Sequence, residues 1–229
     1  MAPSTAQRLD RTVILDAAQR LVAIEGPDAL TMRKLGAELQ SDPTAVYRHF
    51  RSKDEIVGAL TERMFAEVSA NYTASADWRT DLRWIMVAVY RVYVTNVALA
   101  ASLASEPWEN PTQQQGSELI LDMLHRAGLR GAPLAMMHHV VITVIAGAGV
   151  YNAYEPKVSA ADRARLQRSF GSLPEQSHPR ITEVAGELFP DQERVFQALV
   201  DTIIIGIEIQ TERSQHDYGS PTDEEVHLA

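Results

Sequence analysis

The side chains best suited to bind another molecule gather in one short segment near the N-terminus. Between residues 31 and 53, five basic residues stand against two acidic ones. Arg48 can donate two hydrogen bonds to the O6 and N7 atoms of a guanine. Tyr47 and His49 can donate to phosphate oxygens, and Lys53 lies where a helix is expected to begin, a position that favours phosphate. These residue types, so spaced, indicate contact with a nucleic acid.

Two short predicted helices position these side chains. The first is expected at residues 31–39, with Thr31 as its N-cap. The second is expected at residues 43–50, with Asp42 as its N-cap and Pro43 at its first position. A polar turn of about three residues joins them, which is the pattern of a helix-turn-helix.

The second short helix has two distinct faces. Val46 and Phe50 lie four residues apart and can pack on Leu35 of the first short helix. Thr44 and Ala45 then point away together with Arg48, and their small size lets the helix enter a major groove about 12 Å wide. We therefore expect these three residues to read bases, although a phosphate contact by Arg48 remains an alternative.

Two longer predicted helices frame this motif. Ser52, with Glu55 three residues later, forms a capping box that begins a long helix through Met64 and Val68. An amphipathic helix precedes the motif and ends at Gly26. Its expected apolar face consists of Val13, Ala17, Leu21 and Ile24.

Charge and composition exclude several functions. The 229 residues carry 21 Lys and Arg against 30 Asp and Glu, a net charge of −9. Residues 1–60 hold eight of each sign, so the rest of the chain carries the whole negative charge. A protein that is basic throughout and coats nucleic acid is therefore excluded. The absence of cysteine excludes disulfides, thiolate metal sites and cysteine nucleophiles.

The N-terminal segment resembles the DNA-binding domain of TetR-family transcriptional regulators. The similarity covers residues 11–60 and rests on Thr31-Met32-Arg33-Lys34-Leu35-Gly36, Pro43-Thr44-Ala45-Val46-Tyr47-Arg48-His49-Phe50 and Lys53. It implies an all-α homodimer whose C-terminal domain binds a small ligand that alters the spacing of two DNA-binding heads. By position it also implies a base contact for Arg33, although Arg33 and Lys34 can equally be solvated.

The rest of the chain also predicts helices. They are expected at residues 78–96, 117–126, 133–154, 161–170 and 191–211, with a loop at 171–180. We thus expect an all-α fold in three parts: a DNA-binding domain at 1–55, a larger ligand-binding and dimerisation domain at 56–212, and a disordered tail at 213–229. The apolar stretch at 133–151 is interrupted by polar and glycine residues, which indicates a buried helix and a cytoplasmic protein without a membrane span.

A mostly apolar pocket is expected inside the larger domain. Aromatic and methionine side chains there are core residues by default, but a cavity wall uses the same types. We expect a hydrophobic or aromatic ligand, because few charged residues fall on the inward faces. The predicted lining consists of Phe65, Ile85, Val89, Tyr93, Trp108, Met123, Met137 and Val141.

No metal, cofactor or catalytic group is expected. His138 and His139 are adjacent on a helix and point about 100° apart, so core positions are favoured over a metal site. The C-terminal part loosely resembles the tetracycline-repressor type, but Ser102 and Asn152 stand where that type carries a His and a Glu serving a metal. This difference argues against a magnesium–tetracycline ligand.

Two functional hypotheses follow. The leading one is a homodimeric repressor that binds a pseudo-palindromic operator and is released by a small effector. The dimer is expected through the helices at 133–154 and 191–211, with Gly147, Gly149 and Gly206 allowing close approach. The alternative is a small-molecule carrier or enzyme with a vestigial DNA-binding head, for which no catalytic triad or carboxylate pair is present in the sequence.

Overall fold

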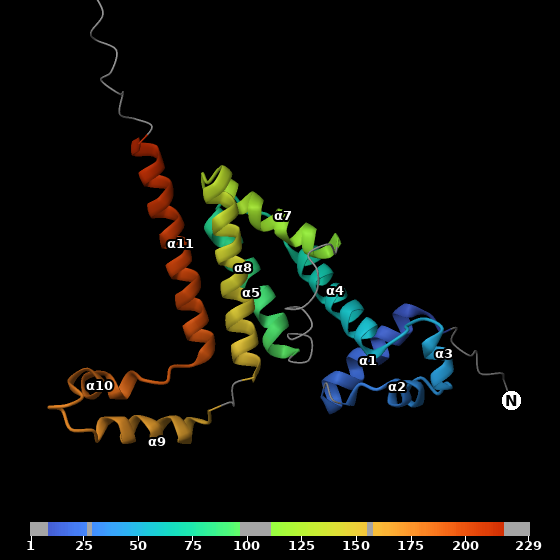
Figure 1. Ribbon diagram of the computed structural model, residues 1–229. Coiled ribbons are helices and arrows are strands. Elements are labelled where there is room, and N and C mark those ends of the chain that lie inside the picture. Colours follow the sequence, from blue (N-terminus) through green and yellow to red (C-terminus); the bar gives the residue numbers. More distant parts are fainter. Residues whose placement is uncertain (1–8, 27–28, 97–110, 155–157, 218–229) are drawn as a thin grey trace, which may run out of the picture. The chain divides into compact units, whose positions relative to one another are not determined.

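Every element in the described part of the chain is helical. The computed structural model describes residues 9–26, 29–96, 111–154 and 158–217, and no strand occurs among them. Their contacts divide the chain into two units, Met1–Ala153 and Tyr154–Ala229, and each is described by itself. Figure 1 follows the helices in chain order. The expected all-α fold with an N-terminal helix-turn-helix is confirmed.

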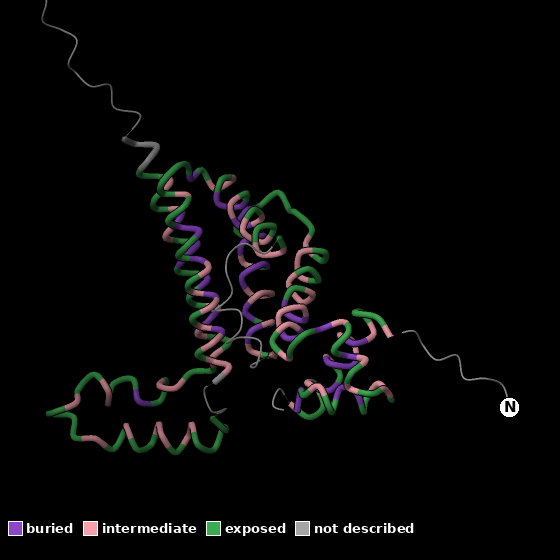
Figure 2. Tube along the Cα trace, turned by 45° about the vertical axis from the view of Figure 1, so that its right-hand side comes forward, coloured by how far each residue is buried: buried purple, intermediate pink, exposed green. Residues whose placement is uncertain are grey.

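The head of the first unit has one continuous core. It is built from α1 (Arg11–Glu25), α2 (Met32–Glu38), α3 (Pro43–Tyr47) and the start of α4 (Lys53–Asn71). Figure 2 shows the buried positions of these four helices facing one another. The core consists of Ile14, Ala17, Ala18, Leu21, Ala29, Leu30, Leu35, Val46, Phe50, Ile56, Val57 and Leu60. A boundary at residue 55 would cut through this core, because α4 supplies its last three members.

Two residues of the expected apolar face of α1, the half-buried Val13 and the exposed Ile24, do not join the core. Ile24 is 81% exposed, so its expected place on the inward face is wrong. It lies in the last turn of the helix, just before Gly26, which leaves helical geometry with a φ of 83°. The inward face is formed instead by Ile14, Ala17 and Leu21 with their neighbour Ala18.

Close backbone packing fixes the angle between α2 and α3. A Cβ on Gly36 would lie 3.0 Å from the carbonyl oxygen of Ser41 and 3.1 Å from the nitrogen of Pro43. The N–H of Ser41 donates to the Gly36 carbonyl over 2.8 Å, and Gln40 takes a positive φ of 49° to make the turn. Only glycine leaves room for this turn, so the orientation of α3 depends on Gly36.

The remainder of the first unit consists of α5 (Trp78–Thr95), α7 (Pro111–Arg126) and α8 (Gly131–Tyr154), the last of which ends at the unit boundary. α7 packs on both α4 and α5, and it begins at Pro111 rather than at the expected residue 117. Gly149 of α8 lies against Tyr93 of α5, where a Cβ would be 2.5 Å from the Cβ of Tyr93. Gly149 therefore serves packing within one chain, rather than only the dimer contact expected from the sequence.

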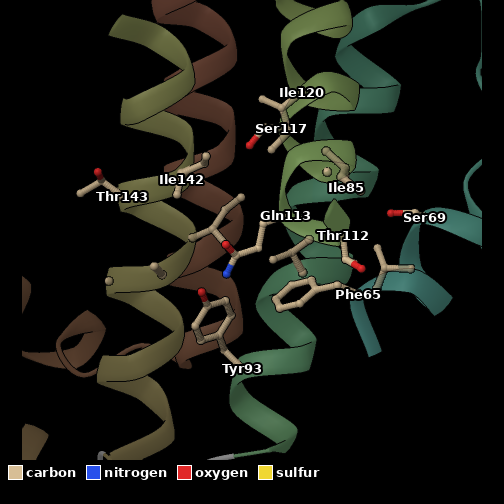
Figure 3. A pocket seen from close by; sticks show the side chains of 16 residues that line it. Phe65, Ser69, Ile85, Tyr93, Thr112, Gln113, Ser117, Ile120, Ile142 and Thr143 are labelled. Atoms are coloured by element: carbon tan, nitrogen blue, oxygen red, sulfur yellow. The ribbon is translucent and has the colours of Figure 1, made fainter. Parts of the chain in front are cut away.

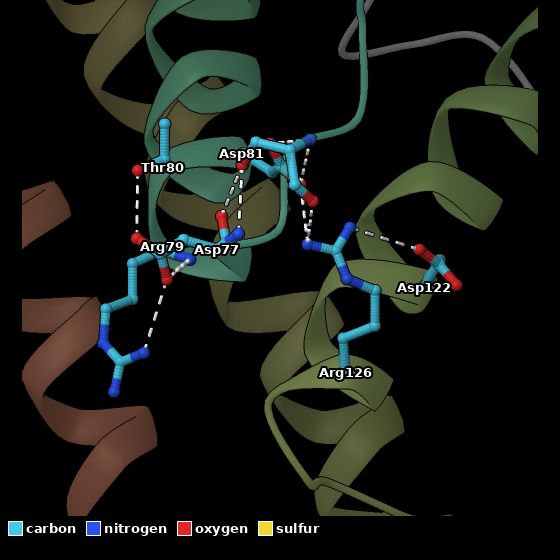
Figure 4. A network of polar contacts seen from close by, with 7 residues as sticks. Asp77, Arg79, Thr80, Asp81, Asp122 and Arg126 are labelled. Carbon is cyan, nitrogen blue, oxygen red and sulfur yellow. Dashed lines mark hydrogen bonds and ion pairs between the residues drawn. The ribbon is translucent and has the colours of Figure 1, made fainter.

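A buried carboxylate ties the α4–α5 connection to α7 (Figure 4). Asp81 accepts hydrogen bonds from the Ser75 backbone N–H over 3.0 Å and from Arg126 Nη2 over 2.7 Å. Arg126 also donates to the Ser75 carbonyl and pairs with Asp122 at 3.8 Å. Burial raises the pKa of Asp81, but the bonds from Arg126 and Ser75 outweigh it and leave that pKa below its usual value.

The second unit contains α9 (Ala160–Gly171), α10 (Pro179–Val184), a short 3₁₀ helix at Ala185–Glu187 and α11 (Gln192–Asp217). Gln167 donates to the carbonyls of Gly186 and Leu188, which holds α9 beside the 3₁₀ helix. α11 continues to Asp217, past residue 213, where the tail was expected to begin.

α8 is apolar enough, by length and composition alone, to cross a membrane, with a mean hydropathy of 1.6 over its best window. It is the one such helix in the described ranges, and a core helix can pass the same test. The helix expected to be buried is only partly so in the single chain, where Met136 is 67% and Tyr151 is 61% exposed.

Candidate nucleic-acid interface and internal pocket

The second helix of the motif presents the predicted side chains outward. Thr44, Tyr47 and Arg48 are exposed, and Ala45 is half-buried at the edge of the core. Val46 is fully buried beneath them and anchors α3. α3 ends at Tyr47, three residues before the expected end, so Arg48 and His49 lie in the turn that follows it.

Side-chain N-caps fix the first turns of α2, α3 and α4, the helices on which the predicted DNA contacts lie. The hydroxyl of Thr31 accepts from the Lys34 N–H over 3.1 Å, and Asp42 accepts from the Thr44 N–H over 2.7 Å. The hydrogen bonds from Thr44 lower the pKa of Asp42 below its usual value, so the cap is a carboxylate. All three predicted N-caps are confirmed, with Ser52 accepting from the Glu55 N–H over 3.1 Å.

The expected capping box at the start of α4 differs in its second half. The Glu55 carboxylate accepts from the backbone N–H of Arg51 over 2.6 Å, one residue before the position that a capping box uses. Its other oxygen pairs with the guanidinium of Arg11 at 3.1 Å. The bond from Arg51 and then the one from Arg11 lower the pKa of Glu55, which keeps it ionised.

Arg11 is a structural residue of this surface that sequence reasoning did not identify. Its Nη1 donates to the His49 carbonyl over 2.6 Å, and its guanidinium lies 3.9 Å from the centre of the Phe50 ring. It thereby fixes the end of the recognition segment to α1. No local signal reveals this role, because the two partners are far from Arg11 in the sequence.

These residues surround a polar hollow of about 380 Å³ beside α3. Three guanidinium groups, one phenol, one imidazole and one carboxylate border it, and the carboxylate is paired with Arg11. The basic groups of such a set can bind a phosphate diester through charge-assisted hydrogen bonds. Thr44, Ala45, Arg33 and Lys53 lie outside its lining. The residues that line the hollow are Arg11, Tyr47, Arg48, His49, Arg51 and Glu55.

The other predicted contacts lie on α2 and α4. Arg33 is exposed in the first turn of α2, and Lys53 is half-buried at the first position of α4. Lys34 pairs with Glu25 at 2.5 Å, so it is engaged at the protein surface rather than simply solvated.

A cavity of about 420 Å³ lies between α4, α5, α7 and α8 (Figure 3). Of the predicted lining, the structure brings together Phe65, Ile85, Val89 and Tyr93. The rings of Phe65 and Tyr93 meet edge to face at 6.3 Å. The other lining residues are Val68, Ser69, Thr112, Gln113, Gly116, Ser117, Ile120, Ile142, Thr143, Ile145, Ala146 and Gly147.

Three predicted pocket residues do not line this cavity. Met123, Met137 and Val141 are buried, but they lie toward the closed end of the α7–α8 hairpin, beyond the last lining residues Ile120 and Ile142. Each of the three side chains points inward as expected. The error was in how far along α7 and α8 the cavity extends. Trp108, the remaining prediction, lies outside the described residues.

The polar part of the cavity wall was missed. Thr112 and Gln113 come from the first turn of α7, which had no assigned structure because the helix was expected to begin at residue 117, and Ser117 was placed in that helix but not in the wall. Pro111 was the available signal, because proline favours the first position of a helix. Within the described ranges, no lining residue carries a carboxylate, an imidazole or an amine, so this part of the wall offers shape and hydrogen bonds rather than charge.

The positions weighed as metal ligands have other roles. Asn152 donates from Nδ2 to the Tyr90 hydroxyl over 2.9 Å, which links α8 to α5, and Ser102 lies outside the described residues. His138 is buried with a lowered pKa, caused by burial and then by His139, and does not line the cavity. Across the described ranges, no group of three His, Asp or Glu could hold a metal ion.

Relatives of known type share this arrangement. Residues 14–60 match the family described as bacterial regulatory proteins, tetR family. An HTH-type transcriptional regulator of Saccharopolyspora erythraea is 29% identical over 164 residues, 72% of this chain and 66% of that protein. The HTH-type transcriptional repressor DrrR1 of Streptomyces coeruleorubidus is 26% identical over 155 residues, 67% of this chain and 56% of its own length. The chain thus spans about two thirds of the first relative and little more than half of the second.

The fold extends the likeness beyond the head. The crystal structure of the TetR family protein ActR of Streptomyces coelicolor, in complex with actinorhodin, superposes with a TM-score of 0.75 at 23% identity. The superposition covers 90% of this chain and 96% of ActR. Residues 14–60 thus match the tetR family of bacterial regulatory proteins in sequence, and the chain shares the fold of the TetR family protein ActR over 90% of its length.

Proposed function

We propose that this protein is a transcriptional repressor that a small hydrophobic or aromatic effector releases from its operator. The observation that carries the proposal is the double role of α4. The helix begins with Lys53 beside the recognition surface, and its second half supplies Phe65, Val68 and Ser69 to the cavity wall. A molecule that moves the cavity wall therefore also moves the head.

On DNA, α3 enters the major groove. Thr44, Ala45 and Arg48 contact base edges there, and Arg33 contacts a base from the start of α2. Tyr47, His49 and Lys53 hold the phosphates on either side. The arginine-rich hollow beside α3 supports this arrangement, because it offers donors for the adjoining phosphate.

The working molecule is a cytoplasmic homodimer on a pseudo-palindromic operator. On α8, the exposed Met136, Val140 and Tyr151 recur at helical spacing on one face, and on α11 the exposed Ile205 and Ile209 lie four residues apart. Apolar faces of this kind are covered in stable homodimers. Two heads of one dimer then meet half-sites about 34–36 Å apart.

The switch requires an effector that prefers one of two head arrangements. Arg63 of α4 binds Asp16 and Gln19 of α1 at 2.5 and 3.0 Å, so the head follows α4 as one body. Changing occupancy from mostly bound to mostly free needs a preference of a few kcal/mol, roughly 5 kcal/mol for a complete switch. By reciprocity, operator DNA weakens effector binding by the same factor.

A mobility-shift titration on the DNA flanking the protein's own gene tests the proposal. We expect a shift at concentrations far below those needed for random DNA of the same length. Binding to both DNAs with equal affinity at every salt concentration would contradict a sequence-specific regulator. The carrier or enzyme alternative predicts that outcome.

A further inference from the structure

One buried polar atom in the wall of the cavity has no partner. The Oε1 atom of Gln113 is shielded from solvent and accepts no hydrogen bond from any residue that the structure describes. Leaving a buried acceptor unpaired costs about 1–3 kcal/mol, and native proteins keep few such atoms without a reason. The apolar cavity beside Gln113 supplies a reason if a ligand provides the missing donor.

A second polar group faces the same space from another helix. Figure 3 shows the amide of Gln113 on α7 and the hydroxyl of Tyr93 on α5 pointing into the same part of the cavity. Burial raises the pKa of Tyr93, so its phenol stays protonated and can donate a hydrogen bond. One acceptor and one donor thus stand together in a wall that is otherwise mostly apolar.

The remaining wall determines what kind of molecule can carry the matching groups. Among the residues that the structure describes, none that lines the cavity is cationic or anionic, so a charged ligand would find no charged partner on this part of the wall, which is costly in an apolar cavity. The edge of Phe65 against Tyr93 offers a surface on which another aromatic ring can pack. A volume of about 420 Å³ has room for two or three fused or linked rings.

We propose that the effector is an uncharged aromatic molecule with a hydrogen-bond donor that binds Gln113 Oε1 and an acceptor that binds the Tyr93 hydroxyl. This inference rests on the proposed function, since it names the class of molecule that the effector cavity takes. Gln113 is then the residue that selects for the donor. A hydroxylated aromatic ketone is the simplest compound that carries both groups.

The test compares three probes that differ in one substituent: 4-hydroxybenzophenone, 4-methoxybenzophenone and 4-benzoylbenzoate. All carry the ketone acceptor, but only the first has a neutral donor and only the last has a charge. Calorimetric titration measures their affinities for wild type, Gln113→Met and the matched control Gln114→Met, which changes an exposed neighbour on the same helix. Binding should be tightest for the hydroxyl probe in wild type and in the control.

Gln113→Met should weaken the hydroxyl probe about tenfold and leave the methoxy probe unchanged, because methionine keeps the volume and removes the acceptor. Tyr93→Phe should weaken all ketone probes alike. In the absence of any probe, Gln113→Met should raise the melting temperature by about 2–4 °C, since it removes the unpaired atom, whereas Gln114→Met should not.

Each contrary result overturns the proposal. In the titrations, these results are equal affinity of wild type for the hydroxyl and methoxy probes, tighter binding of the carboxylate probe, or no measurable binding of any probe. In the melting experiment, the contrary result is a melting temperature of Gln113→Met at or below that of wild type. Failure of the proposed function is recognised separately, because it appears as the absence of specific operator binding by the probe-free protein.

Discussion

The contact between Gly149 and Tyr93 offers a sharp test of the packing around the cavity. A Cβ at position 149 would lie 2.5 Å from Tyr93 Cβ and 2.7 Å from its Cγ. Carbon atoms pack at about 3.5–4 Å, so Gly149→Ala must separate α5 and α8 locally by roughly 1 Å. The Cβ of Tyr93 is fixed by the backbone and cannot rotate away.

The expected magnitude combines two opposed effects. Alanine in place of glycine within a helix gains about 0.5–1 kcal/mol. Overpacking a well-packed core costs about 1–3 kcal/mol, and a clash with a backbone-bound atom belongs at the upper end of that range. We therefore expect Gly149→Ala to lower the free energy of unfolding by a net of about 1–2 kcal/mol.

Gly116 in α7 supplies the matched control. It also borders the cavity, but nothing lies within 4 Å of a Cβ added there, so Gly116→Ala should gain about 0.5–1 kcal/mol. Urea unfolding at one fixed protein concentration measures both variants. The two changes should have opposite signs, and a Gly149→Ala protein as stable as wild type would refute the described approach of α8 to α5.

Four further outcomes are expected. Asp81→Asn should lower stability by about 2–3 kcal/mol at neutral pH, because it removes the buried carboxylate that accepts from both Arg126 and the Ser75 N–H and leaves Arg126 to the longer ion pair with Asp122 at 3.8 Å. The folded pKa of Asp81 is lowered, so its contribution to the free energy of unfolding is fully present above the unfolded pKa of about 3.9. That contribution is lost as the pH falls through the folded pKa. Unfolding titrations of Asp81→Asn should therefore show a flatter pH dependence in this acidic range than those of wild type. Arg48→Ala should cost about 1–3 kcal/mol on operator DNA and less on random DNA in binding titrations; equal losses would assign Arg48 to phosphate. Lys53→Ala should weaken binding to all sequences and reduce the salt slope by about one unit. Light scattering should find a dimer at micromolar concentration, and a stable monomer would refute the role of the apolar face of α8.

Local signals in the sequence were sufficient to predict the caps of the head helices and the buried face of α3. The caps at Thr31, Asp42 and Ser52 act on backbone groups two or three residues away, so sequence spacing alone determines them. The burial of Val46 and Phe50 likewise follows from their spacing of four residues, which places them on one side of the predicted helix. The second half of the capping box differed because Arg11, distant in sequence, occupies the other oxygen of Glu55.

Only half of the predicted cavity lining was confirmed, and the reason is again that tertiary contacts decide the rest. Helical phase identified Phe65, Ile85, Val89 and Tyr93 as inward, but phase does not tell how far along a helix a cavity extends. That height depends on how α7 and α8 are aligned, which is a tertiary property. Gly149 likewise looked like a dimer contact, because a small residue in a helix does not reveal which neighbour approaches it.

The clamp of Arg63 on α1 has a mechanical consequence. Ile56, Val57 and Leu60 of α4 lie in the head core, and Arg63 and Phe65 follow within five residues. Arg63 is bound to Asp16 and Phe65 belongs to the cavity wall, so no flexible linker separates the head from the cavity. The distance along the helix from Lys53 to Phe65 is about 18 Å at 1.5 Å per residue. A rigid arm of that length, tilted by about 5° around Phe65, displaces Lys53 by about 1.6 Å. Hydrogen bonds tolerate a donor–acceptor range of about 0.5 Å, so a small change at the cavity is enough to break the phosphate contact that we propose for Lys53.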